Sequence, residues 1–504
     1  MNYRDTGPAH ETMFFADTEI LTQQGKWPAL EALASRWVRA DAGNAQAWLA
    51  LSRAAFELGR FRAALDAFQK VMDCSGRTAA NLTTYGRLAL QALEFEIAAA
   101  ALAEAETLDP HAPEMLAARG LLLTYQGRFA EAESYCRKCL ERSPEFVPAY
   151  TTLSRLTQGR FTNQEMTILS RLQSRLSLPL DHRIAAAFAF AHGHYARGDS
   201  SIAFRAYEYA HVLCEGRNQR EGRRYDALRT ADRMDRLMEL FPAGHDEMQA
   251  HAMSHPVPIF IVGMPRSGTT LIESVLSAHS RVRAGGERPQ MQQLLSAYLD
   301  LVEKGQLHKL DSSLAQNWRA AYFSDLRLPG SADHFTDKYL LNFEAAGLIA
   351  RLFPAATIIH VRRNPLETCF SIYRNEFSKF WTFTDRLKDI GHYYGQYARL
   401  VNHWARLLGP RFHTVQYEMF AGAFDTMAPA LIAACGLDWE EQCRNFQSVK
   451  REISTFSAVQ AREAVSVRSG AAEQYRSFLG DLHDALDVAR VDFATGALLT
   501  ATSC

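Results

Sequence analysis

The segment from Pro258 to His279, PIFIVGMPRSGTTLIESVLSAH, combines residue types that can hold an anion. An apolar run typical of a buried strand leads into glycines 263 and 268, and a stretch with helical periodicity follows. In such a strand–loop–helix unit, backbone N–H groups and the positive end of the helix point toward a phosphate or sulfate group. The sequence therefore predicts an anion-binding loop here.

The residue at position 269 separates two kinds of chemistry. The glycine spacing is that of nucleoside triphosphatases, but Thr269 stands where those enzymes have lysine. A triphosphatase needs that lysine and Mg²⁺ to neutralise the terminal phosphates. A sulfuryl group carries less negative charge, so arginine, hydroxyls and backbone donors would suffice, and we expect no metal ion in the site. The loop supplies such groups from Arg266, Ser267, Gly268, Thr269 and Thr270.

The loop PRSGTT resembles the 5′-phosphosulfate loop of sulfotransferases. Their donor is 3′-phosphoadenosine 5′-phosphosulfate (PAPS), and their nucleotide product is 3′,5′-adenosine bisphosphate (PAP). The similarity runs from about residue 257 to residue 480. It implies that the loop binds the 5′ end of the donor and that Arg266 is also one of the catalytic residues.

A second segment, ATIIHVRRNPLETCFSIYR, resembles the 3′-phosphate site of the same family. Arg363 ends a predicted strand, and Ser371 follows eight residues later in a predicted helix. A planar guanidinium can grip a phosphate with two hydrogen bonds, and a serine hydroxyl adds a neutral one. The plainer alternative is a strand-ending arginine and an ordinary helical serine. Arg362 either joins them or only lies nearby.

Two more segments resemble those of tyrosylprotein sulfotransferases. SRVRAGGERPQ places Glu287 after a short strand and a glycine turn, 21 residues beyond Arg266, where the resemblance implies the general base. A carboxylate there can take the proton of the acceptor hydroxyl. In DHFTDKYLLNF, the TDK-x-x-x-N pattern implies that Lys338 stabilises the charge that grows on the leaving phosphate. The plainer alternatives are a surface glutamate and a solvent-facing lysine, and Asn342 either caps or orients.

The C-terminal part supplies the last cofactor candidates. The segment FHTVQYEMF reads as a strand carrying Tyr417, and the resemblance implies that this side chain lies near the adenosine. Residues 454–469 resemble the segment that closes over the donor, with Ser457 and Arg462 as candidates for the 3′-phosphate. The usual aromatic and basic run is missing after this segment, so Arg468 is an equal alternative.

The N-terminal half repeats itself with a period of 34 residues. Three segments align without gaps, and their small and aromatic residues fall in common columns: Ser52, Gly86, Gly120; Ala64, Ala98, Ala132; Phe61, Phe95, Phe129. Short side chains allow two antiparallel helices to approach closely, and the aromatic residue fills the space beside them. These columns resemble tetratricopeptide repeats over about residues 44–144, and a weaker copy precedes them. The chain therefore resembles bacterial sulfotransferases fused to such repeats.

The predicted architecture has two domains. Residues 10–240 should form an all-α tetratricopeptide-repeat superhelix. Residues 255–485 should form a P-loop-like three-layer α/β domain with a mainly parallel sheet. Repeat arrays expose a concave face that commonly holds peptides, so we expect an acceptor peptide or protein as partner. A scaffold packed on the catalytic domain is the other interpretation.

Composition narrows the remaining classes. The formal charge of −1 and the 47% hydrophobic content fit an ordinary globular protein without a basic field for nucleic acid. We find no segment typical of a membrane span or an export signal, so we expect a cytoplasmic protein. The oligomeric state is open, with a homodimer as one form to test.

The sequence thus predicts a sulfotransferase that moves a sulfuryl group from PAPS to an acceptor hydroxyl, with a protein or peptide tyrosine as one candidate. A glycan, a lipid or a small metabolite would suit the same residues. Two other functions stay open at this point: a nucleotide kinase of the same fold, and a peptide-binding repeat scaffold without catalytic activity.

Overall fold

The computed structural model describes residues 8–242, 256–306, 310–324, 326, 332–377, 379–449, 459 and 470–499, with side chains from residue 14 onward. Contacts divide the chain into two compact units that meet in sequence at Arg197 and Gly198. The domain limits 10–240 and 255–485 stay a prediction about where each part would fold alone. In the described residues no helix is long and apolar enough to cross a membrane.

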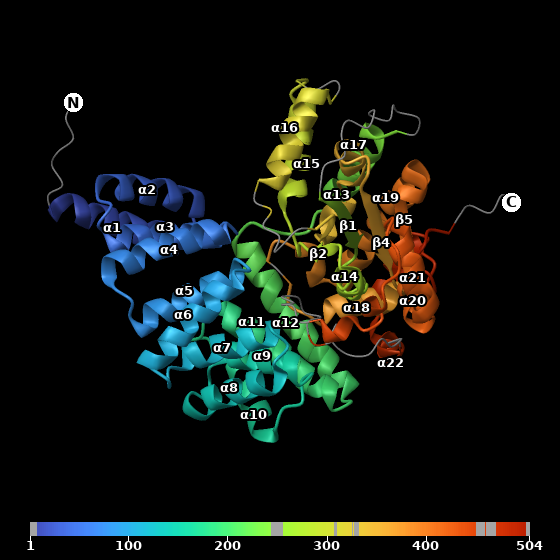
Figure 1. Ribbon diagram of the computed structural model, residues 1–504. Coiled ribbons are helices and arrows are strands. Elements are labelled where there is room, and N and C mark those ends of the chain that lie inside the picture. The colour runs from blue at the N-terminus through green and yellow to red at the C-terminus, as the bar shows by residue number, and fades with distance from the viewer. Residues whose placement is uncertain are drawn as a thin grey trace. The chain divides into compact units, whose positions relative to one another are not determined.

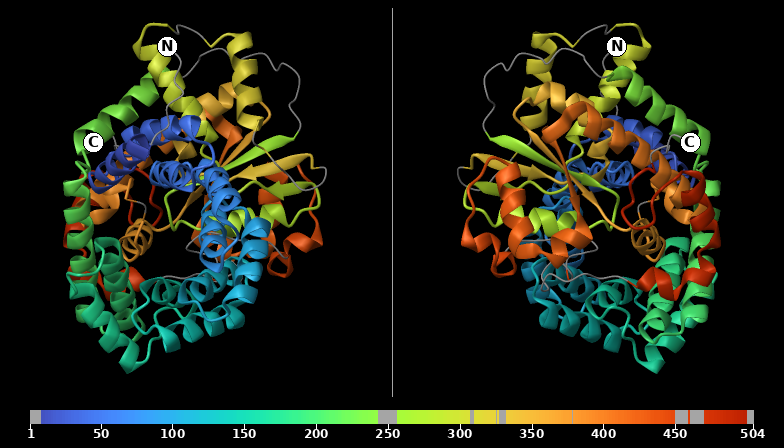
Figure 2. Two further views of the ribbon diagram at one scale, coloured as in Figure 1. Left: turned by 90° about the vertical axis from the view of Figure 1, so that its left-hand side faces the viewer. Right: turned by 90° about the vertical axis from the view of Figure 1, so that its right-hand side faces the viewer.

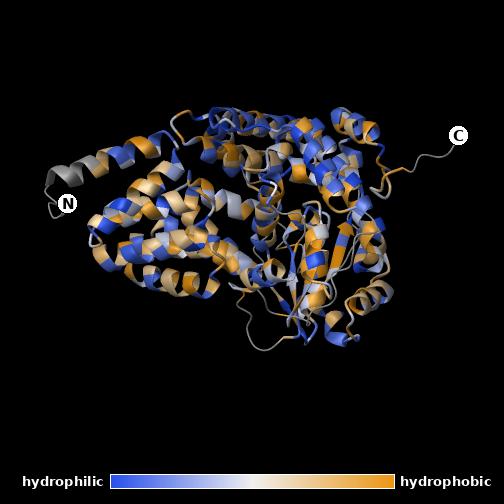
Figure 3. Ribbon diagram, turned by 90° about the horizontal axis from the view of Figure 1, so that it is seen from above, coloured by the Kyte–Doolittle hydropathy of each residue, from blue (hydrophilic) through white to orange (hydrophobic). Residues whose placement is uncertain are grey.

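The first unit consists of consecutive helices that pair as antiparallel hairpins (Figure 1). Its helices are α1 (Pro8–Gln23), α2 (Trp27–Ala40), α3 (Ala45–Glu57), α4 (Phe61–Ser75), α5 (Ala79–Gln91), α6 (Phe95–Leu108), α7 (Pro113–Tyr125), α8 (Phe129–Arg142), α9 (Val147–Leu156), α10 (Asn163–Ser174) and α11 (Leu180–Ala196). Hydrophobic and hydrophilic stretches alternate along these helices (Figure 3), as expected when one face of each helix is buried.

The columns of the repeat have the positions that close packing requires. A Cβ at Gly86 would lie 2.7 Å from Leu102 Cγ, and a Cβ at Gly120 would lie 2.7 Å from Cys136 Sγ. The third member of that column, Ser52, donates a hydrogen bond to the Ala64 carbonyl at 2.8 Å. Only small residues fit between the paired helices at these points. The all-α repeat architecture predicted for this part is therefore confirmed.

The turns inside the hairpins share one backbone conformation. Residues 25, 59, 93 and 127 recur at the repeat period, and all four have a positive φ. Three of them are glycines, which adopt this conformation without strain. The fourth is Leu93, with a φ of +59°.

The second unit contains a five-stranded sheet (Figure 2). The strands are β1 (Val257–Gly263), β2 (Val282–Ala284), β3 (His334–Asp337), β4 (Thr357–Arg362) and β5 (Phe412–Gln416), in the order β2-β3-β1-β4-β5. Every pairing between them is parallel, which confirms the predicted parallel sheet. All residues of β1 are buried, as a strand covered on both faces must be.

Helices cover both faces of this sheet, which gives the predicted three layers. On one face, Ile259 and Ile261 pack in a core with residues of α14 and α21. On the other face, Phe260 packs against Tyr322 of α16 and Phe353. The α-helices of this unit are α12 (Ser200–Arg220), α13 (Ala227–Leu240), α14 (Thr269–Ser277), α15 (Gln290–Glu303), α16 (Ser312–Phe323), α17 (Ala346–Leu352), α18 (Pro365–Tyr373), α19 (Leu387–Leu408), α20 (Tyr417–Gly422), α21 (Phe424–Ala434), α22 (Ala471–Gln474) and α23 (Gly480–Val488).

Short 3₁₀ turns complete the unit: η1 (Leu340–Phe343), η2 (Thr382–Asp385), η3 (Gly409–Arg411), η4 (Glu441–Cys443), η5 (Phe446–Ser448) and η7 (Arg476–Phe478). By contacts, α12 and α13 belong with the sheet, although they continue the helical half of the sequence. On α13, Asp235 accepts a hydrogen bond from Arg399 of α19 at 2.6 Å. Tyr225, just before α13, is hydrogen-bonded to His392, which also lies on α19, at 2.7 Å.

Candidate active site

The candidate residues follow the carboxyl ends of all five strands. Because every pairing is parallel, these ends share one edge of the sheet, where ligands of α/β domains bind. The residues that follow β2, β3, β1, β4 and β5 in this order are Glu287, Lys338, the loop 264–268, Arg363 and Tyr417. The strand order, which the sequence does not reveal, thus places the loop in the middle of the candidate set.

The loop after β1 is held in a strained conformation. Arg266 has a φ of +68°, which is unusual for a residue with a side chain and costs about 1 kcal/mol or more. The loop ends at Gly268, which precedes α14 and supplies no side-chain cap, so the helix begins directly at the loop. Ser267 is 1% exposed, and its Oγ has no hydrogen-bond partner. Such an orphaned hydroxyl suits a bound anion.

Gly268 is required where the loop meets Tyr417. Its φ is +103°, and a Cβ there would lie 2.4 Å from Tyr417 Cδ2. The Arg363 guanidinium lies 4.9 Å from the centroid of the same ring, which is cation–π distance. The sequence predicted a strand that includes Tyr417, and this was wrong: β5 ends at Gln416, and Tyr417 is the first residue of α20. The side chain is nevertheless at the loop.

Hydrogen bonds join three of the predicted donor-binding residues. Arg266 Nε donates to Ser371 Oγ at 3.1 Å, and Arg363 Nη1 donates to the Arg266 carbonyl at 3.2 Å. Ser371 is buried on α18, whose start is fixed because the Asn364 side chain accepts from the Glu367 N–H at 3.0 Å. The residues expected at the two ends of the nucleotide are thus already linked.

Arg362 points to a different partner. Its Nε donates to Gln416 Oε1 at 3.1 Å, across the neighbouring strands β4 and β5. This bond supports the sheet edge, whereas Arg363 contacts the loop. The two neighbouring arginines therefore contact different parts of the domain.

Glu287 and Lys338 form an ion pair. The Lys338 N–H donates to the Gly286 carbonyl at 2.8 Å, which aligns the segments after β2 and β3. Their side chains then meet, with 2.7 Å between Lys338 Nζ and Glu287 Oε1. The Lys338 side chain is 2% exposed and that of Glu287 is 43% exposed. The predicted cation is therefore buried, whereas the predicted base is open to solvent and to an acceptor.

A buried carboxylate lies directly before Lys338. Asp337 accepts hydrogen bonds from the Tyr322 hydroxyl at 2.7 Å, the Tyr339 N–H at 3.1 Å and Asn342 Nδ2 at 3.1 Å. Burial raises the pKa of the Asp337 carboxyl to about 7, although the bonds from Tyr322 and Tyr339 act in the opposite direction. This group fixes the backbone from which the Lys338 side chain leaves.

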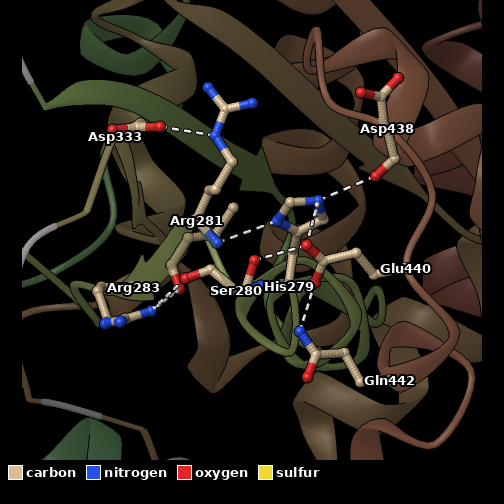
Figure 4. A network of polar contacts seen from close by, with 9 residues as sticks. His279, Ser280, Arg281, Arg283, Asp333, Asp438, Glu440 and Gln442 are labelled. Carbon is tan, nitrogen blue, oxygen red and sulfur yellow. Dashed lines mark hydrogen bonds and ion pairs between the residues drawn. The ribbon is translucent and has the colours of Figure 1, made fainter.

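A network of polar contacts around the buried His279 supports the start of β2 (Figure 4). His279 lies after α14 and is hydrogen-bonded through Nε2 to the Asp438 carbonyl at 2.9 Å, while its Nδ1 accepts from the Arg281 N–H at 3.1 Å. The Ser280 N–H donates to Glu440 at 2.8 Å. Both nitrogens of this imidazole are engaged, so we interpret the network as structural support for the β2 segment.

Matches to family models include the residues at this edge of the sheet. Residues 258–441 match the model of the sulfotransferase family, and residues 23–76 and 84–145 match that of the tetratricopeptide repeat. The first match contains the loop and the candidate residues after all five strands. Residues 258–441 are thus similar to the sulfotransferase family. Tetratricopeptide repeats precede these residues, and the predicted resemblance is confirmed.

The matches to individual relatives cover only part of each relative. An uncharacterized protein of Aquifex aeolicus is 27% identical over 358 residues, which are 68% of this chain and 46% of that protein. A protein named protein-tyrosine sulfotransferase, from Drosophila melanogaster, is 30% identical over 137 residues, or 25% of this chain and 27% of that protein. The chain thus spans about half of the first and about a quarter of the second.

A solved sulfotransferase domain from the Synechococcus PCC 7002 olefin synthase also matches, with 16% identity. The alignment covers 49% of this chain and 99% of that domain, at a TM-score of 0.29.

Two ligands predicted from the sequence, Ser457 and Arg462, lie outside the described residues, as does Arg468. The remaining loop threonines, Thr269 and Thr270, are buried in the first turn of α14. Sequence reasoning missed Asp337 and Tyr322. Asp337 could have been noticed as the acid next to Lys338, whereas nothing in the sequence links Tyr322 to it.

Proposed function

We propose that the α/β domain transfers a sulfuryl group from PAPS to an acceptor hydroxyl. The observation that carries this proposal is the set of side chains at the sheet edge. An anion loop with Arg266 and a second arginine, Arg363, beside Ser371 follow the carboxyl ends of parallel strands. So does a carboxylate beside a buried lysine. These are the groups that a nucleotide with anionic groups at both ends and a hydroxyl acceptor need.

The loop suits the 5′ end of the donor. Ser267 brings a buried hydroxyl that has no protein partner, and a Cβ at Gly268 would enter the ring of Tyr417. Thr269 replaces the lysine that a triphosphatase needs. Residues 266–270 would therefore hold the 5′-phosphosulfate through backbone N–H groups and hydroxyls.

The other end of the nucleotide would lie against α18 and α20. Arg363 and Ser371 supply a guanidinium and a hydroxyl for the 3′-phosphate. The Tyr417 ring beside Gly268 supplies an aromatic surface for the adenosine. Ser457 and Arg462 remain candidates from the sequence for the same phosphate.

Bound PAPS supplies an activated sulfuryl group. Lys338 holds a buried positive charge that stabilises the charge developing on the phosphate more than it stabilises the ground state. Glu287 takes the proton of the acceptor hydroxyl, because its half-exposed carboxylate is the acidic group that contacts Lys338. The 2.7 Å bond between them keeps both in position before the substrates arrive.

The acceptor that we favour is a tyrosine in a peptide or protein. Two observations support it: the match to a protein named protein-tyrosine sulfotransferase, and the repeat array, a type of scaffold that commonly holds peptides. A glycan, a lipid or a small metabolite would be outcomes of the test below. The cytoplasmic location and the homodimer stay predictions.

Ligand binding tests the donor. Full-length protein should gain thermal stability with PAP and gain none with Mg²⁺-ATP. A preference for Mg²⁺-ATP would favour a kinase. A response to neither nucleotide would favour a scaffold without activity.

Transfer of ³⁵S from labelled PAPS tests the reaction. Fractionated cell extract and a tyrosine-containing peptide library serve as acceptors for wild-type protein and Glu287→Ala. We expect labelled material with the wild type only, and its chemistry identifies the acceptor. Equal labelling by both proteins would refute the role of Glu287.

A further inference from the structure

A cluster of metal-ligating side chains lies outside the candidate active site. His211 and Cys214, both on α12, are each 3% exposed, and Asp385 ends η2. One ligand atom from each residue lies within 4.8 Å of the others. The histidine and the cysteine are three residues apart, so that they share one face of the helix. Asp385 approaches that face from a part of the chain that is remote in sequence.

The orientation of the His211 ring is fixed by a main-chain carbonyl. Its Nε2 lies 2.7 Å from the Tyr373 carbonyl oxygen, which can only accept, so Nε2 carries the proton. The ring also stacks on Tyr373, with 4.1 Å between the centroids. The lone pair therefore resides on Nδ1, which is buried. A histidine that binds a metal ion usually donates its other N–H in this way.

The carboxylate is oriented as well. Asn218, one turn beyond Cys214 on α12, donates through Nδ2 to Asp385 Oδ2 at 2.6 Å. This bond fixes one oxygen and leaves the other for a further partner. Two of the three side chains are thus held by a second set of hydrogen bonds, which is the usual construction of a metal site.

The same bonds argue against a nucleophilic triad. In a triad, the acid holds the ring nitrogen that faces away from the nucleophile. Here that nitrogen is held by the Tyr373 carbonyl. Cys214 is also too deeply buried to attack a substrate.

We propose that His211, Cys214 and Asp385 bind a divalent transition-metal ion, for which Zn²⁺ is the best fit. Imidazole nitrogen, thiolate sulfur and carboxylate oxygen are common zinc ligands, with bonds of about 2.0–2.3 Å. Ligand atoms around a tetrahedral ion lie roughly 3.4–3.8 Å apart, so ligand atoms within 4.8 Å of one another need to close by about 1.4 Å at most. Binding releases the proton of the Cys214 thiol to solvent.

A neighbouring cavity borders the cluster on the side of Asp385. It measures about 410 Å³ and is lined by Asp385, Asn218 and Glu215 among others. Two cations near the cluster are engaged by carboxylates, Arg386 by Glu215 and Arg217 by Glu376 at 3.7 Å. The charges of these two arginines are therefore balanced and do not by themselves oppose a bound cation. Three protein ligands and an open position are the pattern of a zinc ion that is accessible to water or a small ligand.

Cobalt(II) provides the test, because its thiolate complexes absorb in the near ultraviolet. Full-length protein is stripped with a chelator and titrated with Co²⁺ and then with Zn²⁺. We expect one Co²⁺ per chain with a thiolate charge-transfer band, displaced by Zn²⁺. Absence of the band in the wild type would overturn the proposal.

Matched variants locate the ion. Cys214→Ser should abolish the band, whereas Cys435→Ser, at another buried cysteine, should retain it. Asn218→Ala should weaken Zn²⁺ binding about 10–100-fold by releasing Asp385. An unchanged band and Zn²⁺ affinity in Cys214→Ser would refute the site. Should Cys214→Ser fail to fold, Asp385→Asn takes its place, with loss of Zn²⁺ affinity as the required result.

Discussion

Lys338 donates a hydrogen bond from Nζ to Glu287 Oε1 at 2.7 Å, across the ends of two neighbouring parallel strands. The lysine is buried and the glutamate is half exposed. The group proposed to stabilise the leaving phosphate and the group proposed to accept a proton therefore contact each other directly. Replacing either one should change the chemical step more than it changes donor binding.

Glu287→Gln keeps the shape of the side chain and removes its basicity. We expect kcat to fall about 10²–10⁴-fold, the usual contribution of a general base, while the affinity for PAP stays unchanged. Steady-state kinetics and calorimetry measure the two quantities. Glu303→Gln, which breaks only a surface ion pair with Arg236, serves as the control. A kcat within twofold of the wild type would refute the assignment.

Lys338→Met keeps most of the buried volume and removes the charge. We expect kcat to fall about 10²–10³-fold with little change in KM for the donor, because the ammonium acts mainly in the transition state. The exposed Lys304→Met is the matched control. A rise in KM at constant kcat would instead show that Lys338 only binds the donor.

Gly268→Ala should block the anion loop. The new Cβ meets the Tyr417 ring and also strains a positive φ, so the affinity for PAP should fall at least about tenfold. Gly436→Ala is a suitable control, since Gly436 also has a positive φ but no atom lies within 4 Å of its Cβ position. Calorimetric titration of both variants with PAP measures the two affinities. Equal PAP affinities would contradict the role of the loop.

The two neighbouring arginines should differ. Arg363→Ala should weaken PAP binding about 10–100-fold, as expected for the loss of a charged hydrogen-bond donor to phosphate. Arg362→Ala removes a bond to Gln416 and should change the affinity less than about threefold. Titration with PAP compares them, and the reverse order would place the 3′-phosphate on Arg362.

The buried Asp337 predicts a pH dependence of stability. Its pKa is about 7 in the folded chain against an ordinary 3.8, so the folded state binds more protons between these values. Its contribution to stability is therefore greatest at low pH and decreases as the pH rises toward 7.

Urea unfolding at pH 5 and pH 8 measures this dependence. The wild type should lose about 2 kcal/mol more than Asp337→Asn over this range. Asp300→Asn, at an exposed aspartate, should behave like the wild type. Parallel pH profiles for wild type and Asp337→Asn would contradict the prediction.

Local patterns predicted much of this molecule. The repeat period located the helical hairpins, and a strand–loop–helix pattern located the anion loop, because both depend on residues close in sequence. Contacts between distant segments were not predictable from one sequence. Arg266 meets Ser371 and Tyr322 meets Asp337 only because the strands take a particular order. His211 and Asp385 also come from segments remote in sequence, so one sequence does not predict that they meet.

The strand predicted through Tyr417 shows a different limit. An apolar and aromatic run is compatible with a strand or with a helix, and the boundary at Gln416 is set by where pairing with β4 stops. Ser457 and Arg462 depended on the resemblance alone, and the described residues do not include them.

Leu93 occupies a bend that its three counterparts fill with glycine, and it takes the same left-handed backbone as they do. The path of the chain at this point is thus imposed by the stacked hairpins on either side and not by the residue itself. A repeat array whose packing determines the backbone in this way can tolerate substitutions at individual repeat positions. Sequence divergence among such arrays is then free to alter what their surfaces recognise while the scaffold persists.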